Sequence, residues 1–373
     1  MSKPDLLIVG GGVIGLALAY ELSNSGMRVQ LIDRGELGRE ASWAGAGILP
    51  PANAATALHP YDQLRAISLE GHRVWAERLR EETGIDNGYR RCGGLYLASS
   101  AGEAAALRGL YNQFQSEQIG VEKLTLQQLA ELEPAIAPGA AADLVKAAYF
   151  TPVECQLRNP HYLHALVSVC QRRGVELLPN VAATGFQVQH DQLQGVETSA
   201  GVLSAGQYCF TSGAWTQTLL AKLGCATAVL PMRGQMLLYA CRERPFARVL
   251  NVGNRYMVAR DDGHVLVGST EEEVGFDKRN TPVALEELQT FACQWVPELR
   301  SATLEQTWAG LRPATFDGFP YLGALPGLSN AFVAAGHFRS GLYLSPGTAR
   351  VMSALLRGED SPIDLHAFRV GRG

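Results

Sequence analysis

The sequence lacks the paired cysteines of a disulfide-bonded or zinc-binding protein. Its 7 cysteines are odd in number and widely scattered, and no Cys-x-x-Cys pair occurs among them. A disulfide framework and a structural zinc site both require cysteines at close or regular spacing. We therefore predict reduced thiols in a cytoplasmic protein, and no bound metal.

The chain also lacks a long uninterrupted apolar run and an excess of basic charge. Its longest apolar stretch, Leu6 to Tyr20, is broken by glycines and is shorter than the roughly 18 residues that a membrane-spanning helix needs. Lysine and arginine total 32 against 36 aspartate and glutamate residues, which gives a net charge of −4 at pH 7. This balance provides no general attraction to nucleic acid or to an anionic membrane, so we expect neither as a partner.

Low-complexity tracts, internal repeats and linkers rich in proline or serine are missing as well. With 373 residues, of which 47% are hydrophobic and 18% charged, the chain exceeds the size at which one core stops growing. Two domains with separate cores are therefore expected. No long segment has the composition typical of disorder.

The first 33 residues have the pattern of a dinucleotide-binding β-α-β unit. An apolar strand over 6–9 leads into a glycine-rich turn at 10–15, a helix follows over 13–25, and a second strand over 28–32 ends at Asp33. The turn fits G-x-G-x-x-G, and the acid follows it by about 20 residues, as the dinucleotide fingerprint requires. The strand, the helix and the acid in register favour dinucleotide binding over ordinary turn glycines.

Each residue type in this fingerprint has a physical role. Gly10 allows the tight turn, Gly12 lets the backbone approach the pyrophosphate, and Gly15 permits close packing of helix on strand. The start of the helix offers free N–H groups to the phosphates. The predicted cofactor contacts here are therefore Gly10, Gly12, Val13, Ile14, Gly15, Asp33 and Arg34, with Asp33 accepting from the ribose hydroxyls. The fingerprint alone does not separate FAD from NAD, but a disulfide reductase would need a second fingerprint and a redox cysteine pair.

Helical and strand patterns alternate along the rest of the chain. Helices are predicted at 62–82, 103–117, 126–132 and 158–173, the last with Asn159 as its cap and a proline in its first turn. Strands are predicted at 94–98, 175–178 and 208–211, in a hairpin at 186–188 and 195–198, and antiparallel at 236–239, 256–259 and 265–270. The α/β segments thus lie at the start, middle and end, so one domain is expected to be discontinuous.

Three later segments point to a family. Arg39–Gly47 resembles the small-residue segment that wraps the flavin in amine-oxidising flavoproteins of the D-amino-acid oxidase superfamily. Thr307–Pro313 and Ala335–Gly341 resemble more narrowly the glycine oxidases of thiamine biosynthesis, and the similarity spans nearly the full length. The resemblance implies an α/β fold with a discontinuous Rossmann-like FAD-binding domain at 1–85, 147–224 and 307–373. It also implies a second, α+β substrate domain built on an antiparallel sheet at 86–146 and 225–306.

The resemblance further implies which residues contact FAD. They are Ala41, Ser42, Ala46, Gly47, Val181, Ser212, Gly213, Gly336, His337, Arg339, Ser340, Gly341 and Leu342. The last helix, which begins near residues 340–341, would place positive potential at the N1–C2=O edge of the reduced flavin. Some relatives attach FAD through a late cysteine, but no cysteine follows Cys293 here. We therefore expect noncovalent FAD.

Four residues are predicted at the catalytic site. Arg312 and Tyr256 match family positions that hold the substrate carboxylate, the arginine through a bidentate pair. Arg339 belongs to the last flavin motif. Glu271 stands where at least some glycine oxidases have an apolar residue facing the substrate, so the chain departs from the pattern there. Its carboxylate is expected either to face the substrate amine or to turn to solvent, and the sequence leaves both open.

The implied reaction is oxidative deamination of glycine or a related small amino acid such as sarcosine or D-alanine. A hydride would pass from the α-carbon to the flavin, the imino acid would hydrolyse, and oxygen would be reduced to hydrogen peroxide. The expected partners are thus a small amino acid and oxygen, and self-association into a homo-oligomer stays open. Two alternatives remain: a D-amino-acid dehydrogenase that uses another electron acceptor, and a catalytically inactive flavin-binding protein.

Overall fold

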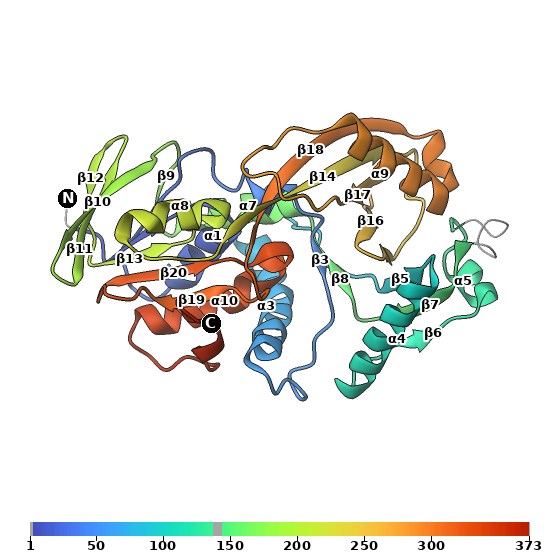
Figure 1. Ribbon diagram of the computed structural model, residues 1–373, viewed down its shortest axis with the longest axis horizontal. Coiled ribbons are helices and arrows are strands. Elements are labelled where there is room, and N and C mark those ends of the chain that lie inside the picture. Colours follow the sequence, from blue (N-terminus) through green and yellow to red (C-terminus); the bar gives the residue numbers. More distant parts are fainter. Residues whose placement is uncertain (1–2, 137–143, 373) are drawn as a thin grey trace.

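A six-stranded sheet collects strands from widely separated parts of the chain. The computed structural model describes residues 3–136 and 144–372, and the strand order of this sheet is β19-β20-β13-β1-β2-β9. All neighbours are parallel except β19, which is antiparallel at the edge. The strands are β1 (Leu6–Val9), β2 (Val29–Ile32), β9 (Glu176–Leu178), β13 (Gln207–Phe210), β19 (Tyr321–Ala324) and β20 (Ala331–Ala335). In Figure 1 this sheet lies in the left half of the view.

The alternation of side chains along β1 explains how both faces of this sheet are covered. Leu6 and Ile8 pack into a core shared with the helices, whereas Leu7 and Val9 pack into a second core on the other face. The helices of the first core are α1 (Val13–Leu22), α3 (Pro60–Thr83), α7 (Asn159–Arg172) and α10 (Gly341–Leu356). The second core includes the three-stranded sheet of β10 (Ala183–Gln189), β11 (Gln192–Thr198) and β12 (Gly201–Leu203).

An eight-stranded sheet forms the other large unit, toward the right of Figure 1. Its order is β18-β14-β17-β16-β15-β5-β7-β6, and its pairs are antiparallel except for β15 with β5. The strands are β5 (Gly94–Ala98), β6 (Glu122–Lys123), β7 (Ala147–Thr151), β14 (Leu230–Ala240), β15 (Val249–Val252), β16 (Arg255–Ala259), β17 (His264–Gly268) and β18 (Thr303–Ala314). Around it lie α4 (Ala101–Ser116), α5 (Leu126–Leu132) and α9 (Pro282–Trp295).

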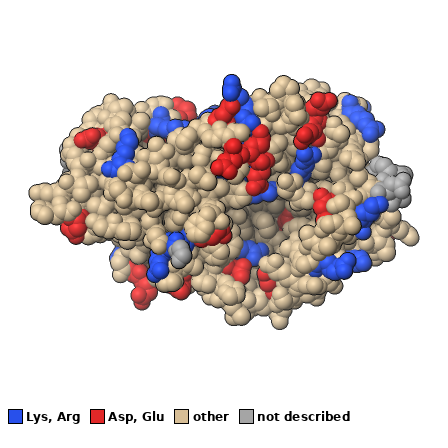
Figure 2. Space-filling view, viewed as in Figure 1, with Lys and Arg blue, Asp and Glu red and all other residues tan. Residues whose placement is uncertain are grey.

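Short elements join the two large sheets. The strands β3 (Ile48–Leu49), β8 (Cys155–Gln156) and β4 (Arg90–Arg91) form a small antiparallel sheet. The helices α2 (Ala41–Ala44) and α8 (Thr216–Leu220) follow glycine-containing segments. Lysine and arginine are interspersed with aspartate and glutamate over the face shown in Figure 2. In the part of the chain that is described, no helix has the length and apolar character needed to cross a membrane.

The predicted fold class is confirmed, with local differences. The strands predicted at 6–9 and 94–98 and the helix at 126–132 have the predicted bounds. The prediction that Asn159 caps a helix is wrong: Arg158 is in the N-cap position and α7 begins at Asn159, whose side-chain nitrogen donates to the Ser42 carbonyl at 2.8 Å. β18 is not predicted from the sequence pattern, and its first four residues are exposed.

The predicted division into domain segments stays a proposal. Two observations refine it. β7 pairs within the eight-stranded sheet, although the prediction places residues 147–224 in the FAD-binding domain. β18 runs across the predicted boundary at 307. The antiparallel ladder is thus the better guide to the boundaries.

Candidate active site

A cavity of about 500 Å³ opens between the two large sheets, and its walls come from both of them. On one side it reaches the carboxyl ends of β1 and β13 through Gly10 and Ser212. On the other side it reaches Tyr256 of β16 and Arg312 of β18. Ligands of open α/β sheets bind beyond the carboxyl ends of the strands, where this cavity lies.

The glycines at the start of this cavity are required by close backbone approaches. Gly10 has a φ of +123°, and a Cβ atom added there would lie 2.5 Å from the Thr211 carbonyl oxygen. A Cβ atom at Gly15 would lie 2.0 Å from the Gly10 carbonyl oxygen. Gly15 does not line the cavity, but it brings α1 against the glycine turn, as the fingerprint predicts.

The acid after β2 stabilises the same turn. Asp33 accepts hydrogen bonds from Gly11 N at 2.7 Å and Gly35 N at 2.9 Å. Burial raises the pKa of Asp33, and these two backbone donors oppose the rise. Arg34 next to it lies 3.5 Å from the ring centre of Trp215. Asp33 and Arg34 both line the cavity, at the position where the fingerprint places the ribose.

The amino terminus of α1 faces the cavity, and a side chain from α2 accepts a hydrogen bond from one of its free N–H groups. The hydroxyl of Ser42 accepts from Val13 N at 2.9 Å. Gly12, Val13 and Ile14 all line the cavity. A helix start in this position is suited to bind the phosphates of a dinucleotide.

The opposite end of the cavity is formed by the turn before α10. His337 precedes the 3₁₀ turn η4 (Phe338–Ser340), is buried, and lies with Nε2 3.0 Å from the Thr348 hydroxyl. Burial lowers the pKa of His337 to about 3, so its imidazole is neutral at physiological pH. His337 thus adds no charge at this end, where the guanidinium group of Arg339 and the start of α10 provide positive potential. Gly336 does not line the cavity; a Cβ atom there would lie 2.5 Å from Cγ2 of Thr315.

The structure brings the predicted site residues together with three exceptions. Every one of them lines the cavity except Gly15, Gly336 and Glu271. The two glycines serve the backbone next to it. Glu271 is exposed, and its Oε2 lies 3.5 Å from Nη1 of Arg339, a cavity residue. Nη2 of Arg339 donates to the Asn254 carbonyl at 2.9 Å, so this arginine ties the turn before α10 to the β15–β16 hairpin.

Arg312 presents an unneutralised guanidinium group to the cavity. Its Nη2 donates to the Ser269 hydroxyl at 2.6 Å and its Nη1 to the Thr270 carbonyl at 3.1 Å. Both acceptors are uncharged, and no carboxylate among the described residues forms an ion pair with Arg312. The hydroxyl of Tyr256, on β16, has a 3.4 Å contact with the Met236 sulfur and no other hydrogen-bond partner in the described part of the chain. Both polar groups are thus available to an anionic ligand.

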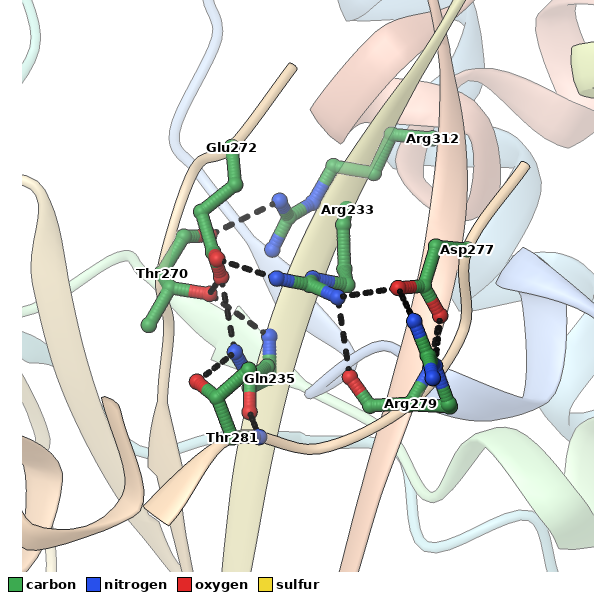
Figure 3. A network of polar contacts seen from close by, with 8 residues as sticks. All are labelled: Arg233, Gln235, Thr270, Glu272, Asp277, Arg279, Thr281 and Arg312. Carbon is green, nitrogen blue, oxygen red and sulfur yellow. Dashed lines mark hydrogen bonds and ion pairs between the residues drawn. The ribbon is translucent and has the colours of Figure 1, made fainter. Parts of the chain in front are cut away.

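The nearby carboxylates are paired with a different arginine (Figure 3). Arg233 is 5% exposed; it pairs with Glu272 at 2.5 Å and with Asp277 at 3.5 Å. Oε1 of Glu272 also accepts from the Thr270 hydroxyl at 2.5 Å and from Nε2 of Gln235 at 2.8 Å. This network holds Thr270, whose carbonyl oxygen in turn orients Arg312. Glu272 and Asp277 are thus paired with Arg233 and do not neutralise Arg312, whose guanidinium group can pair with an anionic ligand.

Sequence reasoning missed two parts of the site. Ser269 and Thr270, the partners of Arg312, follow β17 directly, and only the fold brings them to β18. Asn251 lines the cavity opposite Tyr256 in the β15–β16 hairpin. The Gly253-Asn254 dipeptide between them was a usable signal, because a two-residue glycine-containing turn sets this pairing.

The fold and the cavity define a dinucleotide-binding protein, and comparison with known proteins identifies the family. Residues 5–355 match the family described as FAD dependent oxidoreductase, to which the chain belongs. FAD is therefore its cofactor. The small residues at Gly10 and Gly12 and the buried, unpartnered Oδ1 of Asn159 in the cavity wall fit such a large polar group.

Individual relatives narrow the comparison. Glycine oxidase of Pseudomonas putida is 36% identical over 98% of this chain and 97% of its own. Glycine oxidase of Pseudomonas aeruginosa is 35% identical over 96% of each chain. The crystal structure of glycine oxidase from Geobacillus kaustophilus superposes with a TM-score of 0.94 at 30% identity and covers 100% of both chains.

Proposed function

We propose that this protein catalyses the flavin-dependent oxidative deamination of glycine or a related small amino acid. The observation that carries the proposal is the position of Arg312 and Tyr256. They line the same cavity as the dinucleotide fingerprint, and Arg312 has no carboxylate partner among the described residues. A guanidinium group held by neutral acceptors is a site for the carboxylate of an amino acid. The glycine oxidases among its relatives support this substrate class.

The side chains of the protein bind and orient the substrate. Arg312 would pair with the carboxylate through its guanidinium group, and the hydroxyl of Tyr256 would donate to the same carboxylate. This two-point clamp fixes the α-carbon, which turns the reaction into an oriented, effectively unimolecular step. When bound, FAD supplies the two-electron oxidant. The substrate reacts as its neutral amine, after its ammonium proton has passed to water. The imino acid that leaves the site hydrolyses in water to the 2-oxo acid and the free amine, ammonia in the case of glycine, so no side chain is required as a general acid or base.

The cofactor contacts are part of the proposal. The residues around Gly10, Asp33 and Ser42 would hold the adenosine and pyrophosphate, and the turn from His337 to Leu342 would meet the isoalloxazine ring. None of the described residues that line the cavity is a cysteine, and all seven cysteines are free thiols. Both observations support noncovalent FAD. The free thiols also support a cytoplasmic location.

Oxygen is proposed as the electron acceptor. The purified, yellow protein should release intact FAD on denaturation and should form hydrogen peroxide in air with glycine, sarcosine or D-alanine. Flavin reduction by these amino acids without peroxide in air would instead favour a dehydrogenase. A protein whose flavin no amino acid reduces would be an inactive flavin-binding protein.

A further inference from the structure

A fully buried carboxyl group lies behind the wall of the cavity. Glu154, between β7 and β8, has no exposed surface. Its Oε1 accepts from the side-chain nitrogen of Asn251 at 3.0 Å, and its Oε2 accepts from the Tyr96 hydroxyl. Within residues 3–136 and 144–372, no lysine, arginine or histidine pairs with it. Buried carboxyl groups are rare without a cation, so this one needs a reason.

The sheet provides room for this carboxyl group. In the strand register, Tyr96 of β5 stands beside Asn251 of β15, which stands beside Tyr256 of β16. The three residues therefore form one row across the sheet and point to one face. Glu154 lies over this face at Gly94, where an added Cβ atom would be 2.5 Å from the carboxyl carbon. A side chain at residue 94 would exclude Glu154 from this place.

The contacts of Asn251 determine which of its polar atoms a ligand can use. Its nitrogen is bound to Glu154, which fixes the amide so that this atom points away from the cavity. No donor in the described part of the chain binds its oxygen, and Asn251 lines the cavity. Residues directly opposite on antiparallel strands have Cβ atoms about 4.5–5.5 Å apart. The Cβ atoms of Asn251 and Tyr256 are therefore neighbours in this row, and Tyr256 is one of the two carboxylate ligands.

We propose that the side-chain oxygen of Asn251 accepts a hydrogen bond from the amino group of the substrate, and that Glu154 and Tyr96 are positioning residues for this amide. The inference rests on the proposed function. In an α-amino acid the amine is only one carbon away from the carboxylate, so its hydrogen-bond acceptor must lie beside the carboxylate clamp. Asn251 meets this condition, whereas Glu271 is exposed and bound to Arg339.

The proposal predicts that removing the amide of Asn251 weakens the binding of ligands that carry an amine more than that of ligands that lack one. Asn251→Leu keeps the approximate size of the side chain and removes the acceptor. It should raise the KM for glycine about tenfold, as expected for one lost hydrogen bond in a closed site. The inhibition constant of acetate, which has the carboxylate but no amine, should change less than about threefold on the same scale. Flavin content should equal that of the wild type.

Tyr256→Phe is the matched control in the same row of the sheet. This substitution removes a group that binds the carboxylate, so it should raise the KM for glycine and the inhibition constant of acetate by similar factors. If Asn251→Leu raises the KM for glycine and the inhibition constant of acetate by the same factor, or changes neither of them, the assignment of Asn251 is wrong. If the wild type itself does not oxidise glycine, sarcosine or D-alanine, the proposed function fails first, and the two failures are distinguishable.

The positioning role has its own test. Tyr96→Phe keeps the ring and removes only the donor to Glu154, so the amide of Asn251 should lose part of its orientation. The KM for glycine should rise by a smaller factor, about threefold, with the inhibition constant of acetate unchanged. An unchanged KM for glycine would overturn the positioning role of Tyr96 and Glu154.

Discussion

The guanidinium group of Arg312 on β18 lies against the backbone of Gly234 on the neighbouring strand β14. A Cβ atom at residue 234 would lie 2.2 Å from Nη2 of Arg312, well inside van der Waals contact. Gly234 has no positive φ, so an alanine strains no backbone there. The absence of a side chain at this position is what allows the arginine to lie flat in the cavity wall.

Gly234→Ala should therefore displace Arg312 without unfolding the protein. A displacement on the order of 1 Å of a positioning group costs about a hundredfold in rate. We expect kcat/KM for glycine to fall between about tenfold and a hundredfold while the bound FAD stays at the wild-type level. Gly109→Ala in α4, where an added Cβ atom has no neighbour within 4 Å, is the control. Equal kinetics of the two variants would show that Arg312 tolerates the methyl group.

Glu272 should matter for both stability and substrate affinity. Glu272→Ala leaves the buried Arg233 with the Asp277 carboxylate at 3.5 Å and the Arg279 carbonyl at 3.0 Å, and removes the acceptor of the Thr270 hydroxyl. Breaking a buried pair costs up to about 3–5 kcal/mol. The KM for glycine should rise because Thr270 no longer holds Arg312, and Glu272→Gln should restore part of the affinity. Kinetics and chemical denaturation measure both effects, with exposed Glu273→Ala as the control. A lower stability with an unchanged KM would show that the network around Glu272 stabilises the fold but does not position Arg312.

Glu154 should make the stability of the protein depend on pH. Burial raises the pKa of Glu154 to about 7 from 4.5, opposed by hydrogen bonds from Tyr96 and Asn251. The folded state thus binds the proton on Glu154 more tightly than the unfolded state does. The contribution of Glu154 to stability is therefore greatest below pH 4.5 and is lost as the pH rises to about 7. Burial also raises the pKa of the titratable neighbours Tyr96, Cys92 and Cys155, which stay neutral in this range.

Glu154→Gln removes this titration. Relative to the wild type, the variant should gain on the order of 3 kcal/mol between pH 4.5 and pH 8, because one pKa unit corresponds to about 1.4 kcal/mol. Denaturation at these two pH values, at a fixed concentration of FAD, measures the difference. If the gap between variant and wild type is the same at both, Glu154 does not titrate between them.

Glu271 should have little influence on substrate choice. Its carboxylate is exposed and its ion pair with Arg339 is 3.5 Å long, and exposed pairs contribute about 0–1 kcal/mol. Glu271→Met should therefore change kcat/KM by less than about fivefold. The order of preference among glycine, sarcosine and D-alanine should be unchanged. A reversed order would show that the carboxylate reaches the amine after all.

The sequence predicts the local features of this protein well. The β-α-β unit is encoded by a buried apolar strand, glycines and an acid within 33 residues, and both β1 and Asp33 are where the pattern predicts them. The β16–β17 hairpin was also recognisable, since its turn contains Asp262-Gly263. Arg312 was placed by its motif, although no periodicity predicted β18 around it.

Contacts between distant segments were beyond sequence reasoning. The sequence around Asn159 resembles a helix cap. The side-chain nitrogen of Asn159 instead donates to the carbonyl of Ser42, which lies 117 residues away in the sequence. Glu154 and Asn251 are 97 residues apart, and neither belongs to a motif. The first pair depends on how α7 packs against α2, and the second depends on strand register in the eight-stranded sheet, which a single sequence does not specify.

The most direct test of the account is the anaerobic addition of glycine to the wild-type protein and to Arg312→Ala. In the wild type, glycine should bleach the flavin absorbance. In the variant, FAD should remain bound, but the carboxylate of glycine loses its charged partner. The transition state should therefore lose about 2–5 kcal/mol of stabilisation, so kcat/KM for glycine should fall by a factor of roughly thirty to several thousand. Bleaching at the same rate in both proteins, or in neither, would contradict the assignment of Arg312 as the carboxylate ligand of an amino-acid oxidase.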